Sequence, residues 1–214
     1  MTTTFLLRTE EEAMRYLQSR DKRLGAVIEQ IGPIERRGNA DLFASTVRHI
    51  ISQQISKKAQ QTVWKRLEER TGGVSISGVL ALPTAELQSM GISFRKADYI
   101  LAFARMVEEG EVDLESLRKK DDKTVIRELV QVPGIGPWTA QMLLIFSLGR
   151  PDVLSYGDFG ILRGMRMVYR HKKIDASRFA RYQKRYSPYG TTASLYLWAV
   201  AGGAIAELDD PAKK

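Results

Sequence analysis

The 214-residue sequence contains no cysteine and only two histidines, His49 and His171. The absence of cysteine excludes disulfide bonds, thiolate catalysis, iron–sulfur clusters and cysteine-ligated zinc. Two histidines are too few for a histidine-rich metal centre. We therefore expect no cofactor that depends on either type of ligand.

Long apolar runs are also missing. No stretch approaches the roughly 18 uncharged residues that a membrane-spanning helix needs. Residues 1–14 contain no apolar run as long as that of a signal peptide, and acidic residues follow the short apolar stretch directly. We therefore expect a soluble, cytoplasmic protein with no membrane partner. The hydrophobic fraction of 43% is nevertheless sufficient for a packed core in a chain of this length.

Basic residues are in excess, with 33 Lys and Arg against 25 Asp and Glu, a net charge of +8. This balance favours a polyanionic partner, and nucleic acid first. Lys57, Lys58, Lys184 and Arg185 are candidates for phosphate contacts, or else ordinary solvated charges. The charge alone is also compatible with a merely soluble basic protein, because net charge determines association rather than fold.

Apolar residues recur at spacings of three to four along most of the chain, which predicts an all-α protein of about ten helices. Thr9 with Glu12 forms the pattern of a capping box for the first helix. A long amphipathic helix is expected from Asp41 to Leu67, with a break near "SQQIS". Residues 34–41 have the composition of a connector, and we find no convincing strand pair.

The stretch "VPGIGPWTA", Val132 to Ala140, places two glycines directly before an apolar helix. Gly134 and Gly136 permit unusual backbone angles and close approach. The free N–H groups of the next helix would then face an anion, with the positive end of the helix dipole behind them. A plain helix–helix turn is the alternative, and the basic net charge favours phosphate.

Three segments together resemble the helix-hairpin-helix DNA glycosylase superfamily: "VPGIGPWTA", the upstream "IISQQIS" (residues 50–56) and the downstream "GRPDVLSYGDFGILRG" (residues 149–164). The resemblance extends over about residues 41–203. It implies two helical lobes with a cleft between them. Residues 1–40 would supply N-terminal helices that pack with the C-terminal lobe. Residues 41–150 would form a helical lobe with the hairpin at about 124–148, and residues 151–214 would carry the catalytic Asp loop and the last helices.

The resemblance also implies roles for the hairpin. Its loop would bind a DNA phosphate through Gly134, Gly136 and Thr139. A structural Na⁺ or K⁺ would be held by backbone carbonyls, those of Val130, Val132 and Ile135. In "SQQIS", Gln54 would fill the gap left by a flipped base, whereas two solvated glutamines on a helix are the alternative.

Two features point to one branch of the family. Trp138 stands where bifunctional members have the Lys that forms a Schiff base, so no lyase activity is expected. The chain also lacks the cysteines of the iron–sulfur branch. It therefore resembles the monofunctional alkyl-adenine branch. Only about forty residues precede the matched region, so we expect the N-terminal β domain of the larger bacterial members to be missing.

Asp158 falls where the family has its catalytic Asp. A carboxylate beside the anomeric carbon would stabilise the cationic sugar as the glycosidic bond breaks. Asp158 is also suited to cap the helix that follows, and the two roles are compatible. Asp152, six residues earlier, is expected only to form a turn after Pro151.

A base pocket for an electron-poor, cationic purine calls for aromatic faces. The resemblance assigns it to Trp138, Trp198, Met142 and Gln53, although tryptophan and methionine at helical spacing are also typical core residues. His49 lies within the apolar periodicity and is expected to be a core histidine rather than a catalyst.

The sequence thus predicts a monomeric enzyme of base excision repair that flips and hydrolytically excises alkylated purines of the 3-methyladenine type from double-stranded DNA. Three alternatives remain open. The enzyme could act on another damaged base such as hypoxanthine, the hairpin could belong to a DNA-binding module without activity, or the chain could be an unrelated basic helical protein.

Overall fold

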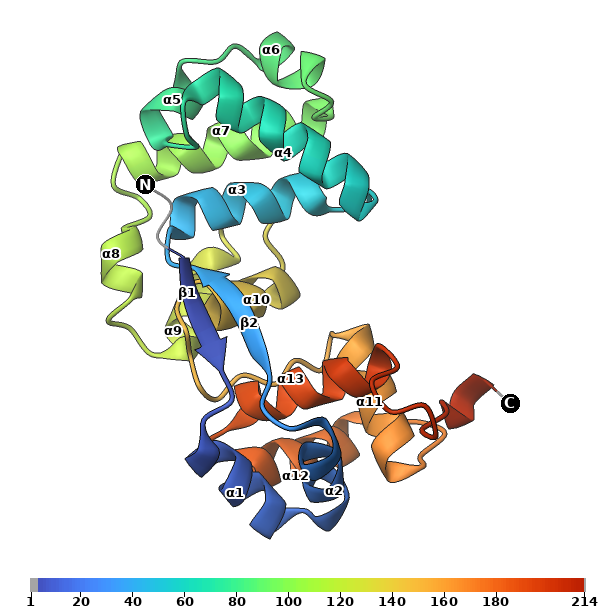
Figure 1. Ribbon diagram of the computed structural model, residues 1–214. Coiled ribbons are helices and arrows are strands. Elements are labelled where there is room, and N and C mark those ends of the chain that lie inside the picture. The colour runs from blue at the N-terminus through green and yellow to red at the C-terminus, as the bar shows by residue number, and fades with distance from the viewer. Residues whose placement is uncertain (1–3, 214) are drawn as a thin grey trace. The chain divides into compact units, whose positions relative to one another are not determined.

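The computed structural model describes residues 4–213, which form thirteen α-helices, one 3-10 helix and two short strands (Figure 1). The predicted all-α class is confirmed. The chain divides into two compact units. The first is residues 39–148 with Thr4, and the second is residues 5–38 and 149–213. Within residues 4–213, no helix has both the length and the apolar character needed to span a bilayer.

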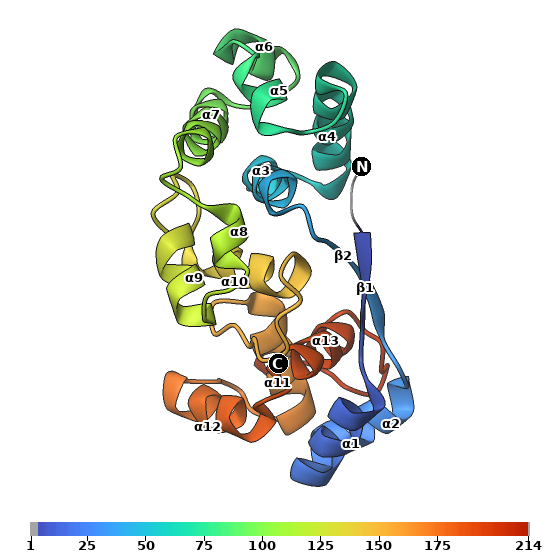
Figure 2. The same cartoon turned by 90° about the vertical axis from the view of Figure 1, so that its left-hand side faces the viewer.

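The first unit contains eight of these helices, α3 to α10, which Figure 2 shows from a second side. Its core includes Phe43 stacked on Phe103, with ring centroids 5.3 Å apart. The predicted break in the long amphipathic segment is confirmed, since one helix ends at Ser52 and the next is capped by the hydroxyl of Ser56. The helices are α3 (Leu42–Ser52), α4 (Lys57–Thr71), α5 (Ile76–Leu80), α6 (Thr84–Ser89), α7 (Phe94–Glu108), α8 (Leu114–Leu117), α9 (Asp122–Leu129) and α10 (Pro137–Phe146).

The second unit joins the two ends of the chain. Tyr196 is fully buried there, and its hydroxyl donates to the carbonyl of Gly32 at 2.8 Å. Helices from residues 11–31 therefore share one core with helices from residues 159–201. The helices are α1 (Glu11–Arg20), α2 (Lys22–Ile31), α11 (Phe159–Tyr169), α12 (Ala176–Tyr186), α13 (Gly190–Ala201) and the 3-10 helix η1 (Pro211–Lys213).

Two strands, β1 (Thr4–Arg8) and β2 (Glu35–Asn39), pair in opposite directions (Figure 1). The expectations of no strand pair and of a connector at residues 34–41 were wrong. β2 reads "ERRGN" and has no alternating apolar pattern, so its sequence gives no strand signal. Its pairing depends on β1, which the helices α1 and α2 separate from it along the chain.

The expected capping box at Thr9 was also wrong. Helix α1 has no side-chain cap. The Thr9 hydroxyl instead accepts from the backbone N–H of Ile34 at 2.9 Å, and the Thr9 N–H donates to the Ile34 carbonyl at 3.0 Å. Thr9 therefore extends the pairing of β1 and β2 rather than starting a helix.

Helices α11 and α13 approach each other at Gly164. A Cβ atom at this position would overlap the carbonyl oxygen of Leu197 and would lie 2.8 Å from its carbonyl carbon. Only glycine therefore allows the backbones to come this close. This contact determines where the residue after Leu197, Trp198, lies relative to the start of α11.

We expect Gly164→Ala to lower the free energy of unfolding by about 3 kcal/mol, because the added methyl group meets a backbone carbonyl that no side-chain rotation can move. Urea-induced unfolding measures this. The matched control is Gly136→Ala, because a Cβ atom there has no neighbour within 4 Å. Equal stability of the two variants would contradict the close approach of α11 and α13.

Candidate functional site

The carboxylate of Asp158 lies at the N-terminus of α11 and is 7% exposed. Its Oδ1 atom accepts a hydrogen bond from the backbone N–H of Ile161 at 2.8 Å. The same oxygen accepts from Nε1 of Trp198 at 2.9 Å. Asp158 is therefore a helix cap, and the indole holds its carboxylate in one orientation.

Gly160 leaves the space that the Trp198 indole occupies. A Cβ atom at Gly160 would lie 2.8 Å from Cδ1 of Trp198 and 3.2 Å from Oδ1 of Asp158. The sequence reasoning did not single out Gly160 or Gly164. Their spacing of four residues, directly after Asp158 in "DFGILRG", is the signal that could have identified them, because residues at that spacing share one helix face.

Asp152 was expected only to form a turn after Pro151; it lies in a bend there, and its side chain bonds to residues far along the chain. Its Oδ1 accepts from the backbone N–H of Gly190 at 3.0 Å, and its Oδ2 accepts from the Ser187 hydroxyl at 2.5 Å. The Ser194 hydroxyl donates to the Val153 carbonyl at 2.8 Å. These bonds attach the segment before Asp158 to the start of α13.

The hairpin consists of α9, a turn and α10, which starts at Pro137. Gly134 adopts a φ of +84°, and a Cβ atom there would overlap the ring of Tyr99. Gly134 is thus required by the fold. Gly136 has an ordinary φ of −95° and open space around it. Nothing within the described residues requires glycine at position 136, so its missing side chain favours the approach of an external group to the N-terminus of α10.

The turn between α3 and α4 is bonded to the hairpin. The side-chain amide of Gln53 donates to the Gly134 carbonyl at 2.7 Å. The Lys96 ammonium donates to the carbonyls of Ile51 at 2.8 Å and of Gln53 at 2.5 Å. Gln53 was predicted in the base pocket, and in this structure its amide supports the hairpin turn.

Gln54 is exposed and adopts a φ of +57°, in the left-handed region that a residue with a Cβ atom rarely occupies. Such strain is often found at functional positions. The next residue, Ile55, is 38% exposed. The sequence reasoning missed Phe94, which starts α7 two residues before Lys96 and is 72% exposed.

Trp138 lies in the first turn of α10 and is 43% exposed. Its ring and the ring of His49 form a T-shaped pair, with centroids 6.4 Å apart. Burial, and secondarily the positive charge of Arg48, lowers the pKa of His49 to about 4, so this imidazole is neutral at pH 7. The other two predicted residues of this helix, Thr139 and Met142, are buried.

The three carbonyl groups proposed for a cation lie at the end of α9 and in the turn. The Val132 carbonyl accepts from the Ile135 N–H at 3.0 Å and retains a second lone pair. Val130 is the C-cap residue that follows α9. All three ligand atoms would be uncharged carbonyl oxygens, which suit a weakly bound monovalent cation better than a divalent one. No group of three acidic or histidine side chains that could hold a metal occurs within residues 4–213.

The family comparison agrees with this arrangement. The model described as "HhH-GPD superfamily base excision DNA repair protein" matches residues 47–188. The chain belongs to this superfamily. The matched region of this HhH-GPD protein contains the α3–α4 turn, the hairpin and Asp158, and the predicted family is thereby confirmed.

Several relatives carry the name of the alkyl-base branch. DNA-3-methyladenine glycosylase 1 of Schizosaccharomyces pombe is 30% identical over 188 residues, covering 83% of this chain and 80% of the relative. The crystal structure of a DNA-3-methyladenine glycosidase from Bacillus halodurans has a TM-score of 0.85 and 35% identity, and the match covers 95% of each chain. The predicted branch is thereby confirmed.

Two further matches define the extent of the likeness. The S. pombe 3-methyladenine DNA glycosylase in complex with abasic DNA has a TM-score of 0.78 and 25% identity, covering 91% of this chain and 98% of that one. The Bacillus subtilis protein YfjP is 31% identical over 170 residues. That match covers 73% of this chain and only 58% of YfjP.

We expect Gly136→Ala to weaken duplex binding about tenfold while leaving the unfolding free energy unchanged, because the methyl group would obstruct only an approaching phosphate. Fluorescence anisotropy with undamaged duplex DNA measures the affinity. If the variant binds as tightly as the wild type, the open space at Gly136 is not a phosphate site.

Proposed function

We propose that this HhH-GPD protein is a monofunctional DNA glycosylase that hydrolyses the N-glycosidic bond of alkylated purines of the 3-methyladenine type. The observation that carries the proposal is the buried Asp158 carboxylate, which the Trp198 indole orients. The names of the relatives support the substrate class. The enzyme would act as a cytoplasmic monomer on double-stranded DNA.

The proposed reaction uses the charge of Asp158. An alkylated purine that carries a positive charge is already a good leaving group, so it needs little protonation. As the bond from C1′ to the base nitrogen breaks, its electron pair leaves with the base and positive charge develops on the sugar. The Asp158 carboxylate stabilises this cation. Water then bonds to C1′ and releases its proton, giving an abasic site and a free base.

We assign Trp198 two roles. Its Nε1–H group fixes the Asp158 carboxylate, as the 2.9 Å bond indicates. Its aromatic face suits stacking with a cationic base. Trp138, which is 43% exposed, stays a proposed aromatic contact for the base. A tryptophan at position 138 has no amine to attack the sugar, so the proposal includes no strand cleavage.

The first unit is proposed to bind the DNA backbone and to fill the gap in the duplex. Gly134, Gly136 and the N-terminus of α10 would bind a phosphate. A Na⁺ or K⁺ ion held by the carbonyls of Val130, Val132 and Ile135 would order the turn and add positive charge beside that phosphate. Thr139 is buried in the first turn of α10, and we propose that it supports the N-terminus that binds the phosphate.

Gln54 is proposed to take the place of the flipped base, because its strained backbone presents an exposed amide at the tip of a turn. The bonds of Gln53 and Lys96 hold this turn. Phe94 is proposed as an additional apolar contact with DNA. We keep Met142 as part of the pocket wall.

We expect Asp158→Asn to reduce base release at least a hundredfold while retaining duplex binding. Asparagine can keep an oxygen acceptor for Ile161 and Trp198, but it lacks the negative charge. The measurement is chromatographic quantification of free bases from methylated duplex DNA, with affinity measured in parallel. Full activity of the variant would contradict the assigned mechanism, and loss of both activity and binding would indicate a folding defect.

Trp198→Phe and Trp198→Ala separate the two roles of the indole. Phenylalanine retains an aromatic face but loses the N–H donor, so we expect slower base release with an unchanged preference among methylated bases. Alanine removes both, so the preference for cationic bases should also weaken. Release rates of 3-methyladenine and 7-methylguanine test this. An unchanged profile in the alanine variant would assign Trp198 to the core alone.

A further inference from the structure

The positive charge of the protein is concentrated in one segment. Residues 170–185 contain seven Lys and Arg residues against a single acidic residue, Asp175. The whole chain has a net charge of +8. The segment begins directly after α11, covers the connector that follows and nearly all of α12, and lies entirely in the second unit. The proposed roles of Asp158 and the hairpin use none of these residues.

This segment forms one side of a cavity of about 550 Å³. The other side is the junction of α1 and α2. The lining residues are Arg20, Asp21, Lys22, Arg23, Tyr169, His171, Tyr182 and Arg185. Four of them are cationic and one is acidic, so the cavity favours an anion.

Two of the guanidinium groups are held in place. Arg23 donates from one terminal nitrogen to the Tyr169 carbonyl at 2.6 Å. Arg185 donates to Oδ2 of Asp21 at 2.5 Å and lies 5.2 Å from the ring centroid of Tyr182. A guanidinium carries five N–H donors, so both retain donors for a ligand. Planar, fixed guanidinium groups match the geometry of phosphate oxygens.

The buried Asp21 does not neutralise the cavity. Its Oδ1 accepts from the backbone N–H groups of Arg23 and Leu24, and its Oδ2 binds Arg185. The Asp21 carboxylate therefore caps α2 and pairs with one guanidinium, and it does not pair with the other three cationic side chains of the cavity. The exposed Arg20 and Lys22 flank it without being needed for these bonds.

His171 also lines the cavity. Its Nε2 lies 2.9 Å from the Tyr182 hydroxyl. Burial lowers its pKa, the charges of Arg178, Arg23 and Arg181 lower it further, and the charge of Asp175 opposes them. A bound anion would compensate for these cations and would raise the pKa of His171.

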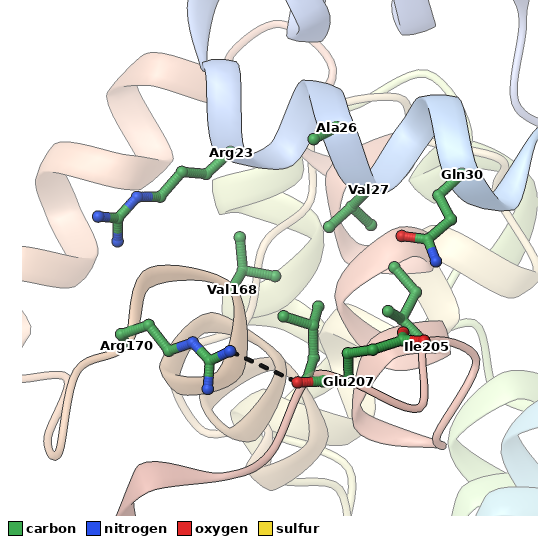
Figure 3. Close-up of a pocket in the computed structure, with 9 residues that line it drawn as sticks. Arg23, Ala26, Val27, Gln30, Val168, Arg170, Ile205 and Glu207 are labelled. Carbon is green, nitrogen blue, oxygen red and sulfur yellow. Dashed lines mark hydrogen bonds between the residues drawn. The ribbon is translucent and has the colours of Figure 1, made fainter.

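An apolar pocket of about 480 Å³ adjoins the cavity through Arg23, which lines both. Figure 3 shows the Arg23 guanidinium pointing away from Val27 and Val168, while Arg170 reaches the carbonyl of Glu207. The charged end of Arg23 thus belongs to the cationic cavity. Nothing within the described residues shows what covers the apolar pocket, so we assign it no ligand.

We propose that the cationic cavity of the second unit is a phosphate-binding site, and that its ligand is a backbone phosphate of duplex DNA. It is separate from the hairpin, which lies in the first unit. The site adds a contact to DNA that requires no damaged base. The proposal does not depend on glycosidic bond cleavage, because its tests measure binding alone.

The two histidines of the chain report separately on the two units. In an NMR titration with inorganic phosphate, at constant ionic strength maintained with chloride, we expect the imidazole signals of His171 to shift and its pKa to rise. His49 lies beside Trp138 in the first unit. A shift of the His49 imidazole signals would therefore report phosphate binding at the hairpin rather than in the cavity.

The variant that tests the site is Arg20→Gln with Lys22→Gln, which leaves the bonds of Arg23 and Arg185 intact. We expect phosphate affinity at His171 to fall about tenfold, as for the loss of charge-assisted hydrogen bonds. The matched control is Arg15→Gln on α1, which removes an exposed charge that does not line the cavity. The control should bind phosphate as the wild type does.

A second measurement distinguishes the source of the phosphate. The salt dependence of binding to undamaged duplex DNA should become shallower in the double variant, by about 1 to 2 in the slope of log K against log salt. If the double variant binds inorganic phosphate more weakly but keeps the wild-type salt slope, the phosphate site is real and its ligand is a small phosphate compound. That result would overturn the assignment to DNA. No phosphate-dependent shift at His171 in the wild type, or an equal shift in the double variant, would overturn the site.

Discussion

The close contact between α11 and α13 is the constraint on which the proposed active site depends. Gly164 allows the α11 backbone to contact the carbonyl of Leu197 in α13. Gly160 leaves room for the indole of Trp198, the residue that follows Leu197. The indole N–H group then reaches Asp158 at 2.9 Å. The carboxylate that is proposed to act on the sugar is therefore positioned by packing between two helices, and its orientation depends on two missing side chains.

Much of the fold and the family could be predicted from local sequence patterns. The all-α class follows from helical periodicity, and the break between α3 and α4 was expected at "SQQIS". The Asp158 cap was expected from its position before an amphipathic segment. The family was identified from three segments whose residue types and order carry the resemblance, and the matched region of residues 47–188 confirms it.

What the sequence could not predict depends on residues that are distant along the chain. The strand β2 is polar and pairs only because β1 lies beside it, and Thr9 bonds to Ile34 rather than to its own helix. The amide of Gln53 bonds to the Gly134 carbonyl across 81 positions. No periodicity or cap signal encodes such pairs, because both describe neighbours within a few residues.

The central claim is that the protein releases alkylated bases and leaves the DNA strand intact. The direct measurement incubates the wild-type protein with methylated duplex DNA, resolves the free bases by chromatography and follows strand length on a denaturing gel. We predict free 3-methyladenine together with strands that break only after alkaline treatment. The absence of any released base, or strand breakage without alkali, would contradict the account.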